Sequence, residues 1–169
     1  MDHKKIIADL EKNKSVFISM LTEQDQNFIS WKPAPEKWSL LEIVCHLHDE
    51  EREDFRARIK HVLTTPELPL PPIDPTGWVL ERKYAERSYP EILELFLSER
   101  DRSIEWLNSL GEVDWKKFYV HPKFGNMSAE MFLSNWLAHD YLHMRQILSL
   151  QFHFLKNQTG ENLQYAGNW

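Results

Sequence analysis

Apolar residues recur every three or four positions over four long stretches of the chain, the spacing that one buried face of an α-helix produces. In the first stretch, residues 3–22, polar residues separate the apolar ones, which are Ile6, Ile7, Leu10, Phe17, Met20 and Leu21. Glycine is scarce, with five residues in 169, so the chain has few of the turns that an all-β fold would need. The pattern predicts an all-α protein that begins with an amphipathic helix.

The second predicted helix runs from residue 39 to about 63 and has a complete start signal. Ser39 stands at the N-cap position, and Glu42 three residues later is the partner that a capping box requires. Trp38 precedes the cap, where an apolar side chain packs on the first turn and in this helix would meet Ile43. These signals place the start of the helix at Ser39.

A proline-rich connector follows, with five prolines between residues 66 and 75 that exclude a regular helix and favour an extended crossover. The third helix has Ser88 at its cap, Glu91 as capping partner and Gly111 just beyond its end. The fourth covers about 128–155. Four long helices with one long connection predict a four-helix bundle with a crossover between helices two and three.

Length and composition predict one domain over residues 1–169 and exclude several partners. The 20 basic and 26 acidic residues give a net charge of −6, so we expect no nucleic-acid partner. No apolar run has the roughly 20 residues that span a bilayer, and the N-terminus lacks a signal-peptide core, so we expect no membrane association. A lone cysteine, Cys45, fits a reducing compartment, and we expect a buried thiol in a cytoplasmic protein.

Two histidines of the fourth helix are the first candidates for chemistry. His139 and His143 lie about 40° apart on a helix, on an arc whose other members are Phe132, Trp136, Gln146, Leu150 and Phe154. Imidazoles at this spacing can bind one ion, and neutral imidazole suits Zn, Ni, Fe or Cu. The alternative is two core histidines that bond to carbonyls or carboxylates, and spacing alone does not decide between them.

A third ligand from the second helix would be His46 or His48, which are two residues apart and cannot share a face. Helical periodicity places His48 on the apolar arc of Leu41, Val44, Phe55 and Val62. It places His46 beside acidic residues, which are Glu42, Asp49, Glu50 and Glu53. Burial favours His48, whereas an open metal pocket with acidic neighbours favours His46. Spacing leaves this choice open.

Two segments together resemble a known family. They are W-S-L-L-E-I-V-C-H-L-H-D at 38–49 and H-D-Y-L-H-M-R-Q-I at 139–147, and they resemble the DinB superfamily, the DinB/YfiT-like metalloenzymes. The P-E-K-W-S approach at 35–39, the M-S-A-E-M-F-L start of the fourth helix and the Y-A-G-N-W tail are also similar to that family. The resemblance therefore covers most of the chain.

The resemblance implies an up-down-down-up four-helix bundle with one divalent transition metal on three histidines, often in a homodimer. The histidine seven residues after the capping serine corresponds to His46, which with His139 and His143 gives the implied ligand set. Nickel or zinc is the expected metal, and iron and manganese are alternatives. The acidic run 49–54 is most simply a solvated helix face, and Asp49 and Glu50 are the candidates in it for a catalytic base or for contact with a ligand histidine.

Three protein ligands leave a position for water or substrate, as in catalytic metal sites. A metal held in this way lowers the pKa of bound water or of a thiol, so hydrolysis and thiol transfer are both accessible. The family is similar in this respect and includes hydrolases and low-molecular-weight-thiol S-transferases. We expect a metal-dependent enzyme that acts on a small-molecule electrophile or hydrolysable substrate, with a thiol cosubstrate in the transferase case. The competing hypothesis is a non-catalytic helical module with structural histidines that mediates dimerisation or partner binding.

Overall fold

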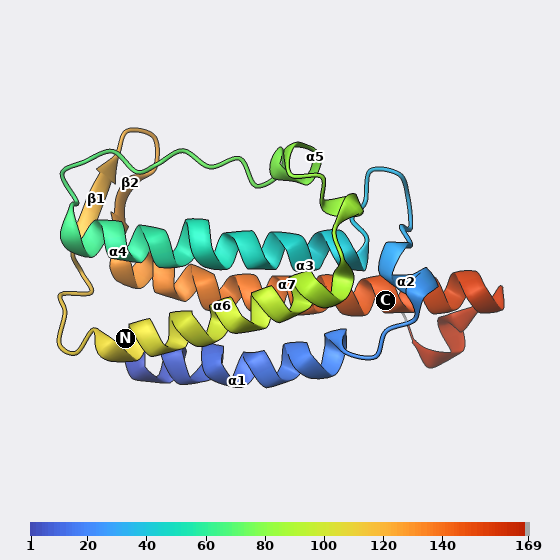
Figure 1. Ribbon diagram of the computed structural model, residues 1–169. Helices are drawn as coiled ribbons and strands as arrows, with labels where there is room; N and C mark the ends of the chain where they lie inside the picture. Colours follow the sequence, from blue (N-terminus) through green and yellow to red (C-terminus); the bar gives the residue numbers. More distant parts are fainter. Residues whose placement is uncertain (168–169) are drawn as a thin grey trace.

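Long helices account for most of the computed structural model, which describes residues 1–167 (Figure 1). The long elements are α1 (His3–Leu21), α3 (Leu40–Asp49), η1 (Glu50–Phe55), α4 (Arg56–Thr64), α6 (Tyr89–Ser109) and α7 (Ala129–Thr159). The short ones are α2 (Gln26–Ser30), α5 (Trp78–Glu81), η2 (Tyr84–Glu86), η3 (Leu163–Ala166) and the strands β1 (Phe118–His121) and β2 (Gly125–Ser128). The last two residues of the Y-A-G-N-W tail, Asn168 and Trp169, lie outside the described residues.

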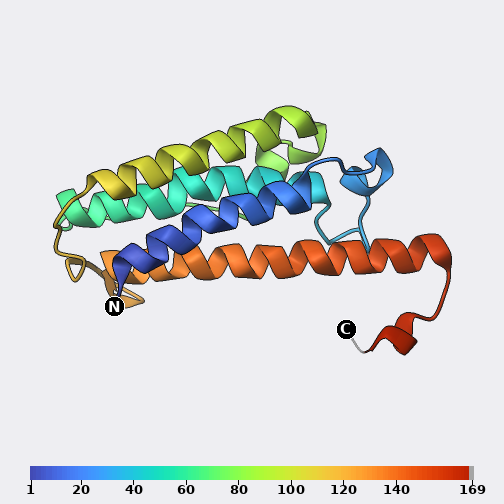
Figure 2. The same ribbon diagram turned by 90° about the horizontal axis from the view of Figure 1, so that it is seen from below.

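The long helices lie side by side in two directions. In Figure 1, α1 and α7 run one way, while the continuous helix α3–η1–α4 and α6 run the other way. The segment between α4 and α6 passes back along the outside of the bundle and carries α5. Figure 2 shows that α7 extends beyond the other helices before the chain turns back at η3.

Most of the predicted helix starts and stops are confirmed. At Ser39 the capping box is complete, because the amide of Glu42 donates to the serine Oγ at 3.3 Å and the Ser39 amide donates to Glu42 Oε2 at 2.8 Å. Gly111 follows α6 with a φ of 62°, as expected for the residue after a helix C-cap. The cap of α6 differs from the prediction, because the Ser88 side chain makes no capping hydrogen bond.

The second predicted helix contains a π-helical segment, η1, which the sequence analysis missed. A π-turn holds about one residue more than an α-turn, so every later residue is rotated by roughly 100° relative to a straight α-helix. The predicted arc of His48 with Phe55 does not hold for this reason, since the Phe55 ring instead lies 5.0 Å from the His139 ring. The predicted solvated face is also wrong, because Asp49, Glu50 and Glu51 are all buried.

A small antiparallel hairpin corrects the all-α expectation. Strand β1 pairs with β2 in a register that joins Phe118 to Ser128 and His121 to Gly125. Gly125 has a φ of 72°, which a residue with a side chain rarely adopts, so it suits the start of the returning strand. The hairpin lies beside α4 and leads directly into α7.

The core consists of two apolar clusters, one at each end of the bundle, with polar residues between them. Along α7, for example, Trp136 belongs to one cluster and Ile147 to the other. Asp140 and His143 lie between these two residues and are both buried. Buried polar residues of the other helices occupy the same level, and they are Asn13, Glu51, Arg100 and Ser103. Over residues 1–167, no helix has the length and apolar character needed to cross a membrane.

Candidate metal centre

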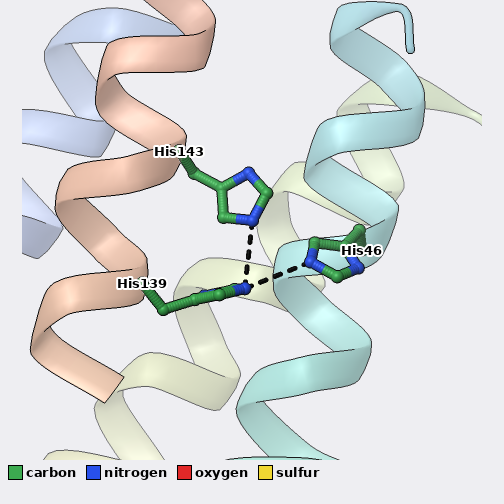
Figure 3. A group of neighbouring side chains, drawn as sticks. All are labelled: His46, His139 and His143. Atoms are coloured by element: carbon green, nitrogen blue, oxygen red, sulfur yellow. Dashed lines mark hydrogen bonds between the residues drawn. The ribbon is translucent and has the colours of Figure 1, made fainter. Parts of the chain in front are cut away.

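Three histidine side chains meet between α3 and α7 at this polar level (Figure 3). The Nε2 atom of His139 lies 3.1 Å from Nε2 of His46 and 3.0 Å from Nε2 of His143. Each residue offers a ring nitrogen within 4.8 Å of the other two. His46 comes from α3, and the other two come from successive turns of α7, so the predicted i, i+4 pair faces the second helix.

All three rings are neutral at physiological pH. Burial lowers the pKa of His46 to about 3 and that of His139 to about 2, and the nearby imidazole of His143 adds to both shifts. Burial also lowers the pKa of His143, to about 4. Neutral imidazole is the form that binds a metal, so these rings need not lose a proton before they bind one.

Hydrogen bonding alone does not satisfy the central nitrogen. The Nε2 atom of a neutral imidazole carries either one hydrogen or one lone pair, but Nε2 of His139 faces two other nitrogens. A single hydrogen or lone pair is therefore shared between the two contacts, so the pair of contacts amounts to less than two full hydrogen bonds. A single cation would accept lone pairs from all three rings, and nitrogens bound to one ion at about 2.1 Å lie about 3.0 to 3.4 Å apart. The two separations from Nε2 of His139, 3.1 and 3.0 Å, fall in this range.

Neighbouring side chains hold the rings in this orientation. Nδ1–H of His143 donates to the Gln146 side-chain carbonyl at 2.8 Å, which leaves the lone pair on Nε2, the atom that points to the other histidines. The Trp38 ring lies 4.8 Å from the His46 ring, and Phe55 packs on His139. Trp38 therefore contacts a candidate ligand, in addition to its predicted place before the helix cap.

The family of the chain follows from a comparison of its sequence with known families. The profile of the DinB superfamily matches residues 9–147, a segment that includes all three histidines. The chain belongs to the DinB superfamily. The resemblance in the sequence is thereby confirmed, and it rests on the same segment of the chain that forms the bundle.

A solved structure has the same fold as this DinB chain. It is YfiT from Bacillus subtilis, described as a probable metal-dependent hydrolase with an unusual four-helix bundle topology. The two chains are 19% identical and superpose with a TM-score of 0.77, over 95% of this chain and 89% of YfiT. At this identity the likeness establishes the four-helix bundle fold. No curated protein matches the chain significantly by sequence.

His48, the other candidate of the second helix, lies away from the cluster. Its Nδ1 atom contacts Asp49 Oδ1 at 3.0 Å, and the Asp49 carboxylate also accepts hydrogen bonds from Tyr84 and pairs with Arg82. These partners lower the pKa of Asp49 to about 2, against the opposing effect of its burial. Asp49 therefore joins the helix to the segment between α4 and α6.

Glu50 faces a cavity beside the cluster. A cavity of about 640 Å³ is lined by Glu50, His139 and mostly apolar side chains, which include Phe55, Phe132, Met127 and Met131. Only 4% of Glu50 is exposed, and its Oε1 atom has no hydrogen-bond partner within residues 1–167. Burial and the neighbouring Asp54 carboxylate raise the pKa of Glu50 to about 8. Of the two predicted acidic residues, Glu50 is the one that lines this cavity.

A second cavity, of about 820 Å³, opens on the other side of the cluster. His143 and Gln146 line it together with Trp38, and its cationic residues are Lys37 and Arg145. Leu142 lines both cavities and is half exposed. The histidine cluster therefore lies between two cavities of different character, one mostly apolar and the other cationic.

A buried ionic network lies next to the histidine cluster and holds the backbone of α7 at Asp140. The Arg100 guanidinium pairs with Glu51 of η1 and with Asp140, which directly follows His139 in α7. The Asn13 amide from α1 donates to the same Asp140 carboxylate, and Trp136 Nε1 donates to Glu51. All four long helical segments therefore meet at one arginine, next to two of the candidate ligands.

The hairpin brings to the site residues that the hydrophobic pattern did not predict. His121 and Phe124 of the hairpin line the apolar cavity with Glu50. The one available signal was the Phe-Gly-Asn turn at 124–126, which follows a short run of aromatic and β-branched residues. Cys45 is a buried thiol, as expected, and burial raises its pKa to about 12.

Proposed function

We propose that this chain is a metal-dependent enzyme that holds one divalent transition metal on His46, His139 and His143. The observation that carries the proposal is the convergence of three neutral Nε2 atoms that hydrogen bonds alone do not satisfy. A cavity on each side gives substrate access to the cluster. Nickel or zinc fits a set of three imidazoles best, with iron or manganese as alternatives.

When bound, the metal would supply a Lewis acid that makes a nucleophile from water or a thiol near neutral pH. The protein supplies the proton transfer. Glu50 holds a proton at its carboxyl group at neutral pH, since its pKa is raised, and its unpaired Oε1 can give that proton up or take one back. The apolar walls beside it, among them Phe55 and Phe132, exclude water from this exchange. Asp49 has a structural role, because its carboxylate already contacts His48, Tyr84 and Arg82.

The reaction class that we propose is hydrolysis, with low-molecular-weight-thiol S-transfer as the second form of the same chemistry. The description of YfiT as a metal-dependent hydrolase supports the first form. Both forms need a small-molecule substrate, and the transferase form also needs a thiol cosubstrate. They differ in whether turnover of an electrophile requires added thiol.

Elemental analysis of protein purified without a His-tag tests the metal site first. We expect close to one metal per chain in the parent protein and in a His48→Ala variant, and its loss in a His46→Ala variant. Loss with His48→Ala instead would assign the ligand to the other histidine of α3. Protein that contains no metal and rebinds none would favour the non-catalytic helical module.

Turnover assays on the metal-loaded protein then separate the two reactions. Activated esters and alkylating electrophiles are incubated with and without added thiol, and a Glu50→Gln variant serves as the control for proton transfer. Turnover without thiol, lost in Glu50→Gln while metal content stays constant, supports the hydrolase. Turnover only with thiol supports the transferase.

The order of the helices, the assembly of the chain and its location in the cell extend this proposal. The helix directions in Figure 1 support the up-down-down-up order, with the proline-rich segment as crossover. We propose a homodimer that forms through an exposed apolar row on α7 at seven-residue spacing, which consists of Tyr141, Leu148 and Leu155. A cytoplasmic location is supported by the single cysteine, which cannot form an internal disulfide.

A further inference from the structure

The two cavities beside the histidine cluster differ in charge. The larger one has Lys37 and Arg145 in its wall and no carboxylate, although the whole chain has a net charge of −6. Within residues 1–167, neither side chain forms an ion pair or a hydrogen bond. The smaller cavity has the Asp54 carboxylate and the Glu50 carboxyl group in its wall, and its strong cation, Arg58, already pairs with Asp54.

A negatively charged group is therefore favoured in the larger cavity and disfavoured in the smaller one. Two unpaired cations attract an anion, and the Trp38 ring and Leu150 in the same wall can pack on the carbon atoms next to it. In the smaller cavity an anion would meet no unpaired Lys or Arg side chain, because Arg58 is bound to Asp54, whereas an apolar group would meet Phe132 and the methionines.

Two histidines of the cluster face different cavities. His143 lines the larger cavity and His139 the smaller one, and their Nε2 atoms lie 3.0 Å apart. Leu142, in the same turn of α7, lines both. A molecule that occupied both cavities would therefore lie close to His139 and His143.

We propose that the substrate is an amphipathic organic anion, with its anionic group held by Lys37 and Arg145 in the larger cavity and its apolar group in the smaller one. This inference rests on the proposed function, because it treats the histidine cluster as the reacting centre. It adds the substrate class and two specificity-determining residues. The bond that reacts lies between the anionic and the apolar group of the substrate.

Two matched probes test the proposal by binding alone. They are 6-phenylhexanoate and its neutral analogue 6-phenylhexan-1-ol, which share the apolar part and differ in charge. Binding to the full-length protein is followed by NMR, with the Trp38 indole resonance as reporter of the larger cavity and the Met131 methyl resonance as reporter of the smaller one. The titrations are repeated after chelator treatment, so that a carboxylate cannot bind to a metal.

We expect the anion to shift both resonances and to bind more tightly than the alcohol, before and after chelation. The double variant Lys37→Gln/Arg145→Gln should weaken binding of the anion about tenfold, the sum expected for two exposed cations, and should leave the alcohol unaffected. The control variant Lys4→Gln/Lys12→Gln removes the same charge from exposed positions on α1 and should bind the anion like the parent protein.

Several outcomes would overturn the proposal: equal affinity for the two probes, no effect of the double variant, an equal effect of the control variant, or no shift at Trp38. These failures are separate from failure of the proposed function. If the protein binds the anion in this way but binds no metal, the anion site is supported and the proposed metal-dependent activity is refuted. If the protein binds metal on the three histidines but binds both probes equally, the metal site is supported and the proposed substrate class is refuted.

Discussion

His139 is the residue on which the other two histidines converge, and its neighbours show how a single side chain is held in place. Phe55 packs against its ring, and the next residue, Asp140, is fixed by Arg100. The backbone of α7 at His139 is therefore anchored independently of any metal. Removal of one ligand should consequently change metal binding without changing the fold.

We predict that His143→Ala lowers metal affinity by more than about 100-fold, because a ligand loss costs more than the loss of an orienting neighbour. The measurement is competition with a chromophoric chelator, with circular dichroism for the helical content. His48→Ala is the matched control, since it removes an equally buried histidine of the bundle and should keep parent-like affinity. A collapse of the helical signal in His143→Ala would contradict the prediction.

The stability of the folded protein should depend on pH through Asp49. Its pKa in the folded protein is about 2, below the ordinary value of 3.8, so the stabilisation it provides is present above pH 4 and is lost as the pH falls towards 2. We predict that Asp49→Asn removes about 1 kcal/mol of this acid-sensitive stability, a value reduced by solvent screening at its partly exposed partner Arg82.

Urea unfolding at several pH values between 2 and 6 measures this term. The parent protein and the variant should differ most above pH 4 and converge near pH 2. A difference in stability that stayed constant over this range would show that Asp49 acts through packing alone and would refute the assigned titration.

At the scale of the elements, the capped helices were predictable and the π-helical segment was not. Ser39 with Glu42 is a local signal, because three residues contain the whole interaction. The segment η1 depends on contacts with other helices, chiefly the pairing of Glu51 with Arg100, 49 residues away. Periodicity assumed a uniform helix and therefore could not choose between His46 and His48, whereas the family resemblance picked the one that faces α7.

The ionic network should contribute strongly to the packing of these elements. We predict that Arg100→Met destabilises the protein by about 3 to 5 kcal/mol, because it leaves the Glu51 and Asp140 carboxylates buried without a cation. The free energy of unfolding in urea is the measurement. Arg102→Met, two residues along the same helix and largely exposed, is the control and should cost less than about 1 kcal/mol. Equal losses of unfolding free energy in the two variants would show that Arg100 contributes no more to stability than an exposed arginine.

On the scale of the whole molecule, the sequence predicted the bundle but not the surroundings of the site. Amphipathic spacing and the prolines of the connector were enough for four helices and one long connection. The hairpin and both cavities are formed by side chains that meet only in the folded chain, such as Phe124 with Glu50 and Trp38 with His143. No local pattern reports such contacts.

The exposed apolar row on α7 leads to a prediction about assembly. We expect Leu148→Glu to convert the proposed homodimer to a monomer, because a charge would be buried in the interface. Sedimentation velocity measures the change. The control is Leu80→Glu, at an exposed leucine on α5 outside the row. A monomeric parent protein, or a dimer that survives Leu148→Glu, would exclude this interface.

The three histidines are separated along the chain in a way that constrains when the site can form. His46 and His139 are 93 residues apart, and His143 lies one turn further on. During synthesis the ribosome must therefore reach the middle of α7 before all three ligands exist, by which time the residues of α1, α3 and α6 have all been added. Metal acquisition by this protein is thus a late event in its biogenesis, and a nascent chain interrupted before residue 143 would hold at most two of the three ligands.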